Sequence, residues 1–336
     1  MDPTAATSAP RPGLLGRVSA APRPYLYGSL AGMGTYLAVM GLTSGNRPEQ
    51  FVLCALMLLL AVWSDATRRF FSGMLPFLLF GIVYDLTHLT EPLVRYLHVH
   101  VAEPYHFDRL FFGIPSGGSR LTPNEFFDRH HWPAVDLVTG SAYILYLYWS
   151  LGFAAWLLLA KRKDERLQRV ARRFGWTFLF VNVAGFATYY VYPSAPPWYV
   201  TRYGLGPANL AAQASAAAAA RWDAMTGIGY FAAFYGRSAD VFGAIPSLHV
   251  SYPLFVFLYG RSLGKRWFDA VSFGFFLLVC FSAVYLQHHY VLDVLLGVTY
   301  TLVGVGVERA LAAQGERRAG VVPAPEPEPI DPARPG

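Results

Sequence analysis

The hydrophobic residues of this chain fall into eight long blocks, which are separated by short polar or basic stretches and by two long loops. A helix that crosses a lipid bilayer needs about 20 consecutive apolar residues, with about 17–25 tolerated. Apolar blocks of this length without two-residue alternation predict transmembrane helices rather than a soluble α/β domain. We expect spans at residues 24–44, 49–65, 70–88, 136–160, 174–193, 244–260, 267–287 and 290–308, of which the second and sixth are near the short limit.

The composition supports a membrane protein. Of the 336 residues, 54% are hydrophobic and only 14% are charged, whereas soluble domains average about 25% charged residues. Cys54 and Cys280 each lie inside an apolar block. They predict small buried hydrophobic side chains rather than a disulfide or a cysteine–metal site. The net charge of +6 is modest and requires no nucleic-acid partner.

The positions of Lys and Arg predict the orientation of the chain. With a cytoplasmic N-terminus, 19 of the 27 basic residues lie in inside segments, including the run from Lys161 to Arg173. Cytoplasmic loops carry an excess of Lys and Arg, so we expect residues 1–23 to be a cytoplasmic N-terminal segment. Residues 24–308 then form the transmembrane domain, and residues 309–336 form a cytoplasmic tail that we expect to be disordered, since from Gly320 onward it is rich in Pro, Glu and Ala without periodicity.

Two long loops, at residues 89–135 and 194–243, lie on the outer side in this topology. The first is too apolar for a free linker, so we expect it to lie across the membrane surface as short amphipathic helices. Its histidines and aromatic residues are His98, His100, His106, Phe111, Phe112, Phe126, Phe127, His130, His131 and Trp132. The second loop directly follows the fifth span and begins with Pro193-Ser-Ala-Pro-Pro-Trp-Tyr199.

Three polar segments meet at the outer face in this topology. Ile245-Pro-Ser-Leu-His249 opens the sixth span, His288-His-Tyr-Val-Leu-Asp293 opens the eighth, and the Pro-Pro-Trp-Tyr segment follows the fifth. Ionisable groups near a bilayer are costly and therefore mark functional sites. The sequence thus predicts an all-α, polytopic helix bundle with one shared site at its outer face.

The spacing of the ionisable residues predicts their roles. His289 and Asp293 are four residues apart, so on a helix they share a face one turn apart. A carboxylate there can accept the Nδ1–H of the imidazole, fix its tautomer and stabilise the ring when it becomes cationic. We therefore predict that His289 is a nucleophile that forms a phospho-histidine intermediate. His249 is the candidate to protonate the leaving oxygen and then to activate an acceptor hydroxyl.

Other interpretations of these residues stay open. His249, His289 and Asp293 could instead bind a metal ion, although the phospho-histidine route requires neither a metal nor another cofactor. The candidate contacts for the substrate and its phosphate are Pro246, Ser247, Trp198, Tyr199, Arg202, Arg237, Asp136 and His288. Pro246 suits a first helical turn, whose free N–H groups and the Ser247 hydroxyl suit a phosphate oxygen. Asp136 could equally be a helix N-cap, and His288 a structural residue.

Two of these segments resemble a known family. Gly243-Ala-Ile-Pro-Ser-Leu-His249, together with Ser282, His289 and Asp293, resembles the second and third signature motifs of the type-2 phosphatidic acid phosphatase superfamily. In that family the second motif is Pro-Ser-x-His, and the third is Ser-Arg, five residues, His, three residues, Asp. The resemblance covers residues 174–308 and implies a six-helix phosphatase-like core. Ala283 stands where the phosphatases carry Arg, and no Lys–Arg–Pro signature precedes the second motif.

With Tyr192-Pro-Ser-Ala-Pro-Pro-Trp-Tyr199, the motifs look like the inositol phosphorylceramide synthase branch. That resemblance implies transfer of phosphoinositol from a phospholipid donor to a ceramide-like lipid alcohol within a membrane. The site would face the periplasm, the exterior or the lumen, in an inner membrane if bacterial and in the Golgi if eukaryotic. Whether a partner subunit takes part stays open.

The missing cations favour this branch, because a phosphodiester carries about one negative charge and a monoester approaches two near neutral pH. A lipid phosphate or polyprenyl pyrophosphate phosphatase is the first alternative. A lipid transporter, which predicts charges at mid-membrane in broken helices, is the second.

Overall fold

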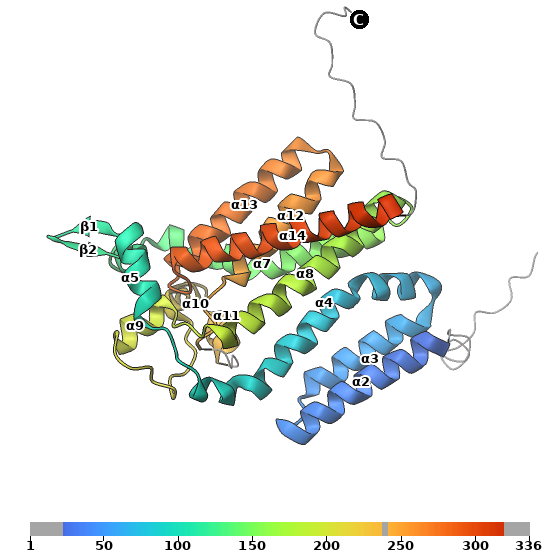
Figure 1. Cartoon of the computed structure of the whole chain (residues 1–336), viewed down its shortest axis with the longest axis horizontal. Helices are drawn as coiled ribbons and strands as arrows, with labels where there is room; N and C mark the ends of the chain where they lie inside the picture. The colour runs from blue at the N-terminus through green and yellow to red at the C-terminus, as the bar shows by residue number, and fades with distance from the viewer. Residues whose placement is uncertain (1–22, 237–240, 319–336) are drawn as a thin grey trace, which may run out of the picture.

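The structure is a computed structural model that describes residues 23–236 and 241–318, and each of the eight predicted spans is a helix in it (Figure 1). These helices are α2 Arg23–Thr43, α3 Pro48–Trp63, α4 Asp65–Thr90, α7 Pro133–Ala160, α8 Glu165–Val191, α12 Leu248–Gly260, α13 Arg266–Tyr285 and α14 Val291–Arg318. The only sheet in the described part of the chain is one small hairpin. The prediction of an all-α helix bundle is confirmed.

Five helices, α4, α7, α8, α13 and α14, are long and apolar enough to cross a membrane. The chain is therefore an integral membrane protein. The other three helices do not reach the length and hydropathy of a full membrane span. Helix α3 has 16 residues, α12 has 13, and four of the 21 residues of α2 are glycine. Helix α12 is short but lies inside the protein, where Val250, Phe255 and Val256 are fully buried.

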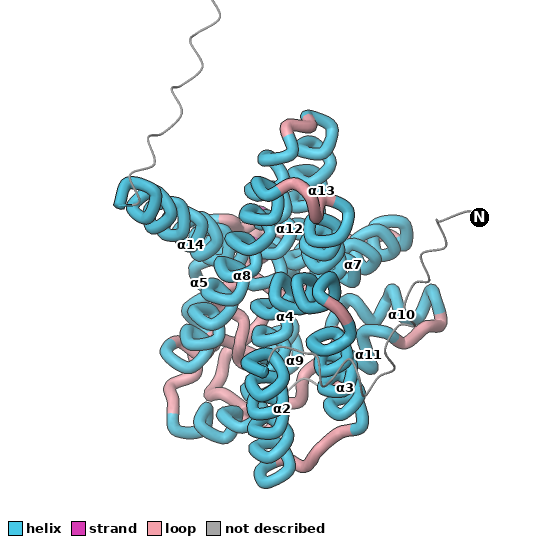
Figure 2. The backbone as a smooth tube through the Cα atoms, turned by 90° about the vertical axis from the view of Figure 1, so that its right-hand side faces the viewer, coloured by secondary structure: helices cyan, strands magenta, loops and turns pink. Residues whose placement is uncertain are grey.

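Helix α12 is the centre of the bundle, since α7, α8, α13 and α14 all pack against it. Helix α4 packs against α7 and α8 and completes a core of six helices, while the α2–α3 pair lies beside α4 (Figures 1 and 2). The core is filled by aromatic rings, such as Phe174, Phe178 and Phe255, which are fully buried. Their centroids lie 5.9–6.2 Å apart, within the range at which aromatic pairs attract one another.

Helix α14 approaches the start of α12 through Gly297. A Cβ atom at this position would lie 2.1 Å from the carbonyl oxygen of Ser247, which is closer than any real Cβ contact. Small residues of this kind let the backbones of membrane helices come together. Gly297 therefore sets the separation of the two segments that carry the predicted motifs.

The two long loops, which the topology prediction assigns to the outer side, fold into short elements at one end of the bundle, on the left in Figure 1. The first loop forms η1 Glu91–Tyr96, α5 Ala102–Phe111, the hairpin β1 Ile114–Ser116 and β2 Ser119–Leu121, and α6 Pro123–Arg129. The second forms α9 Pro197–Tyr203, η2 Ala217–Ala219, α10 Ala220–Thr226 and α11 Tyr230–Tyr235. The expected short helices are present in the first loop, but two of its polar side chains are buried, with Asp108 0% and Asn124 1% exposed.

The opposite end of the bundle holds the start of α2, the end of α14 and the α7–α8 and α12–α13 connections (Figure 1); η3 Arg261–Leu263 begins the second of these. Helix α14 continues to Arg318, so the expectation that a disordered tail begins at residue 309 is wrong for residues 309–318. These residues continue the hydrogen-bonded helix that starts in the membrane-spanning segment. The remainder of the predicted tail and most of the N-terminal segment lie outside the described residues.

Candidate active site

The first motif segment forms the turn that leads into α12. The helix begins at Leu248 with Ser247 at the N-cap position and no side-chain cap. Pro246 precedes the cap, which corrects the prediction that it lies in the first helical turn. The Ser247 N–H donates to the carbonyl oxygen of Asp293 at 2.9 Å and is not free for a phosphate. The Ser247 hydroxyl is buried and has no hydrogen-bond partner among the described residues.

The second motif segment is the tight connection between α13 and α14. The N–H groups of His288 and His289 both donate to the carbonyl oxygen of Ala283, at 3.1 and 3.0 Å. Gln287 has a φ of +69°, in the left-handed region that non-glycine residues rarely adopt. Ala283, at the position where the phosphatases carry Arg, is fully buried and belongs to a hydrophobic cluster of the core.

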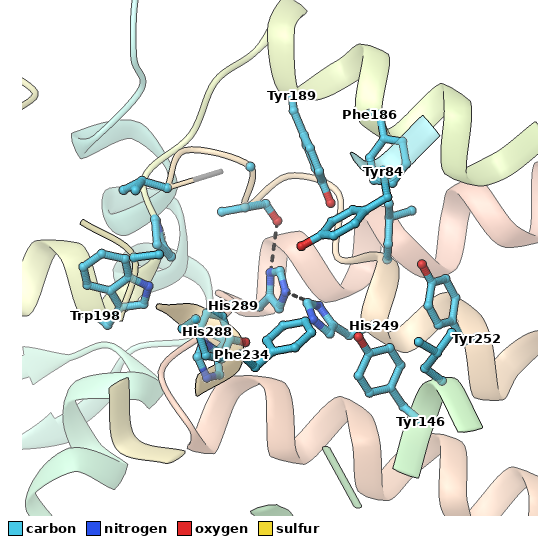
Figure 3. A pocket seen from close by; sticks show the side chains of 18 of the residues that line it. Tyr84, Tyr146, Phe186, Tyr189, Trp198, Phe234, His249, Tyr252, His288 and His289 are labelled. Atoms are coloured by element: carbon cyan, nitrogen blue, oxygen red, sulfur yellow. Dashed lines mark hydrogen bonds between the residues drawn. The ribbon is translucent and has the colours of Figure 1, made fainter. Parts of the chain in front are cut away.

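These two segments bring His249 and His289 together. The Nδ1 atom of His249 lies 2.9 Å from Nε2 of His289 (Figure 3). On its other side, Nδ1 of His289 lies 3.0 Å from the carbonyl oxygen of Ala244. A carbonyl can only accept, so the neutral His289 ring carries its proton on Nδ1. Its Nε2 lone pair then accepts the Nδ1–H of His249 and faces the cavity.

Asp293 lies beside this pair, in the first turn of α14. Its Oδ2 atom is 3.4 Å from Nδ1 of His289 and accepts the N–H of Tyr290 at 2.9 Å. The carboxylate is fully buried, and its Oδ1 has no partner among the described residues. Asp293 is therefore next to the imidazole as the spacing predicts, but the Ala244 carbonyl is the nearer acceptor of the Nδ1–H.

A cavity of about 190 Å³ opens in front of the two imidazoles. Figure 3 shows His249 and His289 facing it among aromatic side chains. The lining residues are Phe80, Tyr84, Tyr146, Leu147, Phe186, Tyr189, Pro196, Trp198, Ala214, Phe234, Tyr235, Val241, Gly243, Ala244, Leu248, His249, Tyr252, His288 and His289. No Lys or Arg is among these described residues. The described part of the lining therefore offers apolar surface and tyrosine hydroxyls.

His288 lines the cavity between two tyrosine rings. Its ring is nearly parallel to those of Tyr143 and Tyr235, at centroid distances of 5.2 and 4.6 Å. Burial lowers the pKa of His288 to about 3, because desolvation disfavours the charged ring. The stacked ring therefore forms part of the cavity lining, and its Nε2 atom has no hydrogen-bond partner among the described residues.

The other predicted contact residues are divided between the cavity and its surroundings. Trp198 lines the cavity. Tyr199 lies behind it, fully within the protein, where its hydroxyl accepts the N–H of Asn209 at 2.6 Å. Arg202 is exposed, lies over the Tyr203 ring at 5.5 Å and does not line the cavity. Arg237 lies outside the described residues.

Asp136 is also away from the cavity. The N-cap of α7 is Trp132, so the alternative that Asp136 is an N-cap is wrong. Its buried carboxylate instead accepts the Nε–H of Arg221 at 2.7 Å. This ion pair joins α7 to α10 and supplies the carboxylate with the partner that burial requires.

The structure also shows site residues that the sequence did not reveal. The side-chain amide of Asn124, in α6, donates to the carbonyl oxygens of Val284 and His289, at 2.8 and 3.0 Å. Asp108, in α5, accepts the N–H groups of Val291 and Leu292, at 2.7 and 3.0 Å. Both side chains come from the long loop before α7, in which no signature motif was found from the sequence.

One local signal in that loop was available. Thr122 and Glu125 form a capping box at the start of α6, and a Thr-x-x-Glu spacing is typical of a helix N-terminus. The spacing predicts a helix that contains residue 124. It does not indicate that Asn124 contacts the loop carrying His289.

A bundle of membrane helices that holds the half-buried His249 and the buried His289 in hydrogen-bond contact beside a buried carboxylate, at the edge of a largely apolar cavity, defines a membrane enzyme with a lipid-like substrate. Comparisons with known proteins place this enzyme in a family. The sequence pattern of the PAP2 superfamily matches residues 119–307, which is more than half of the chain. The chain belongs to that superfamily, as an inositol phosphorylceramide synthase-like phosphotransferase, and this membership favours an enzyme over a transporter.

Similar proteins occur in bacteria and fungi. The chain is 35% identical over 274 residues to the phosphoinositol dihydroceramide synthase of Bacteroides thetaiotaomicron, covering 81% of this chain and 87% of that protein. It is 33% identical over 127 residues to the inositol phosphorylceramide synthase catalytic subunit of Schizosaccharomyces pombe, which is 38% of this chain and 30% of that protein. It is 33% identical over 132 residues to the inositol phosphorylceramide synthase of Candida albicans, which is 39% of this chain and 28% of that protein. No solved structure shows a significant match.

Proposed function

We propose that this enzyme transfers a phosphoinositol-type head group from a glycerophospholipid to a lipid alcohol such as ceramide, through a phospho-histidine intermediate on His289. The observation that carries the proposal is the His249–His289 pair at a cavity whose described lining contains no Lys or Arg. The name of the Bacteroides relative, phosphoinositol dihydroceramide synthase, supports the head group and the acceptor.

The first half-reaction is a displacement at phosphorus. The Nε2 lone pair of His289 attacks the phosphodiester, the bond from phosphorus to the diacylglycerol oxygen breaks, and that oxygen takes a proton from cationic His249. In the second half-reaction His249, now neutral, removes the proton of the acceptor hydroxyl. The resulting oxygen attacks phosphorus and releases Nε2 of His289. Diacylglycerol and the phosphorylated lipid alcohol are the two products.

The hydrogen bond between the two imidazoles describes the resting site. At 2.9 Å, the two nitrogen atoms leave no space for a phosphoryl group between them. Substrate binding must therefore separate the rings and replace this bond by contacts from each ring to the phosphodiester. The neighbouring ring of Tyr143, stacked 4.8 Å from His249, gives the displaced imidazole a surface to move along.

The absence of cations from the described lining agrees with a diester substrate. A diester carries about one negative charge, and removing one or two cationic ligands costs less binding for it than for a monoester dianion. The uncapped first turn of α12 provides N–H groups near His249, and the N-terminus of a helix favours a bound anion. The site end of the bundle is opposite the basic α7–α8 connection (Figure 1), which agrees with an outward-facing site.

The test is lipid mass spectrometry after expression in a host without sphingolipids that is fed ceramide. We expect a new inositol-containing lipid with the wild-type chain and none with His289→Ala or His249→Ala. His131→Ala, which alters an exposed histidine of the outer loop, is the matched control and should leave the product unchanged. Phosphatidic acid hydrolysis without any head-group transfer would contradict the proposal and favour the phosphatase alternative.

A further inference from the structure

The segment that carries His289 is held at both ends by side chains from the outer loop before α7. Asn124 approaches from α6 and is 1% exposed, and Asp108 approaches from α5 and is 0% exposed. Burying a polar side chain is costly unless its hydrogen bonds are satisfied. Each of these side chains makes two hydrogen bonds to this segment, and all four partners are backbone atoms of residues 284–292.

We infer that Asn124 and Asp108 are positioning residues for the nucleophile. This inference rests on the proposed function, because it takes His289 as the group that attacks phosphorus. The amide of Asn124 donates to the carbonyl of His289 itself, at 3.0 Å, and to that of Val284, at 2.8 Å. A side chain from outside the catalytic helices therefore fixes the backbone position of His289, and with it the position of the imidazole relative to the cavity.

Asp108 holds the other end of the segment. Its two carboxylate oxygens accept the first free N–H groups of α14, from Val291 and Leu292. These groups have no partner within their own helix, and a carboxylate at a helix N-terminus is favoured by the helix dipole. Asp293 lies one residue further along, so Asp108 fixes the turn from which the Asp293 carboxylate reaches His289.

The geometry required of a nucleophile makes these contacts kinetically important. A displacement of about 1 Å can cost about 100-fold in rate. Asn124→Asp keeps the shape of the side chain but replaces the amide donor by an oxygen that faces two carbonyl oxygens. We expect kcat to fall by about 10- to 100-fold, with a smaller change in KM, because only two of the described lining residues, His288 and His289, belong to this segment. Asp108→Asn retains one acceptor, so its loss should be smaller.

Thr122→Ala is the matched control. It removes the cap of α6, where the Thr122 hydroxyl accepts the Glu125 N–H, but leaves the Asn124 amide in place. Hydrogen exchange of the amides in residues 284–292 provides a readout that does not depend on activity. Faster exchange there in Asn124→Asp, but not in Thr122→Ala, is the expected result.

Two outcomes would overturn this inference. Near-normal kcat in both Asn124→Asp and Asp108→Asn, while His289→Ala is inactive, would refute positioning and leave the proposed function intact. Unchanged hydrogen exchange of residues 284–292 in Asn124→Asp would refute it as well. Activity that survives in His289→Ala would instead contradict the proposed function, and the exchange measurement would then decide whether Asn124 holds the segment.

A separate cluster at the site end has the donor set of a metal site. One nitrogen each of His98 and His100 and one oxygen of Glu103 lie within 4.8 Å of one another. The rings of His98 and His100, two residues apart in the chain, lie edge to face with their centroids 4.7 Å apart. The Oε1 atom of Glu103 lies 3.0 Å from Nδ1 of His100 and 3.7 Å from Nε2 of His98.

We propose that these three side chains bind a divalent metal ion of the Zn²⁺ class. Two imidazoles and one carboxylate are a known zinc ligand set, and the fourth position is left to water. The His100 ring is fixed in orientation because it stacks on Tyr192 at 3.7 Å with an interplanar angle of 6°. Imidazole and carboxylate together select zinc over calcium or magnesium, which prefer oxygen ligands alone.

The position of the cluster gives the ion a structural role. The backbone of His100 pairs with Ser194, and Ser194 pairs with Gly243, next to the Ala244 carbonyl that contacts His289. Glu103 belongs to α5, the helix that also carries Asp108. A bound ion would therefore fasten the start of α5 to the segment that supports the catalytic histidine.

The test uses the full chain purified without a polyhistidine tag and treated with a chelator. Titration calorimetry should show one equivalent of Zn²⁺ bound by the wild type, with affinity lowered at least about tenfold in His98→Ala and in His100→Ala. His106→Ala, which alters an exposed histidine on the same helix as Glu103, is the control and should bind normally. Equal Zn²⁺ affinity in the wild type and in the His98→Ala/His100→Ala double variant would refute the site.

Discussion

Replacing Asp293 by Asn tests how the nucleophile is held. In the structure Nδ1–H of His289 faces two acceptors, the Ala244 carbonyl at 3.0 Å and the Asp293 carboxylate at 3.4 Å. The Asp293→Asn change would remove the negative charge, but the amide oxygen could still accept the Tyr290 N–H. The Ala244 carbonyl, which is backbone, would remain and would keep the proton on Nδ1. The variant therefore separates the charge of Asp293 from the tautomer of His289.

The expected loss of kcat follows from removing the charge while keeping the tautomer. In triads where the carboxylate alone sets the tautomer, Asp→Asn costs about 10⁴-fold in kcat. Here the tautomer is kept, and only a charge-assisted interaction worth about 1.5–3 kcal/mol is lost. At about 1.4 kcal/mol for each factor of ten, kcat should fall by about 10- to 150-fold. His289→Ala, which removes the nucleophile, should abolish turnover.

The assay is the initial rate of transfer from phosphatidylinositol to a fluorescent ceramide in proteoliposomes, at saturating levels of both lipids. Asp269→Asn, in the first turn of α13 at the opposite end of the bundle, controls for the change of charge and should be within twofold of the wild type. A loss of 10⁴-fold or more in well-folded Asp293→Asn would show that the Ala244 carbonyl does not hold the tautomer. A rate within twofold would show that the Asp293 charge does not assist the reaction.

Three further predictions follow from the same geometry. Gly297→Ala should lower both the thermal unfolding midpoint and the transfer rate, because its Cβ would collide with the Ser247 carbonyl; Gly306→Ala, with open space around it, should change neither in the same melting and transfer assays. Arg202→Ala should leave kcat/KM for the lipid donor within twofold, since the side chain lies outside the cavity. A loss above tenfold would show that Arg202 binds the phosphate of the substrate. His288→Phe should retain the stacking but remove a titrating group. The folded pKa of His288, about 3, is below the unfolded value of about 6.5, so its contribution to stability is complete above pH 6.5 and is lost as the pH falls toward 3. The thermal unfolding midpoints at pH 7.5 and pH 5 should therefore differ less for the variant than for the wild type. An equal difference in the two proteins would contradict the lowered pKa of His288.

Much of the fold could be predicted because its determinants are local. The length of each apolar block, read against the thickness of a bilayer, predicted all eight helices, although three of them fall short of a full span by length or hydropathy. The four-residue spacing of His289 and Asp293 placed them together because one helical turn separates them. The prediction that Pro246 lies in the first helical turn is wrong, because the backbone is extended at the N-cap residue Ser247 and the helix begins only at Leu248.

What the sequence by itself determined was the membrane bundle, the family and the identity of the paired histidines, since these depend on hydropathy and on short motifs. Only the tertiary structure decided how His289 is held. Its acceptor Ala244 and its support Asn124 lie 45 and 165 positions away along the chain, and the first is a backbone carbonyl that no residue type marks. The structure likewise separated Arg202 and Asp136 from the cavity, because an exposed helix face and a buried ion pair are consequences of packing. Local spacing fixes which side chains share a turn, but contacts between distant segments exist only after the helices have packed.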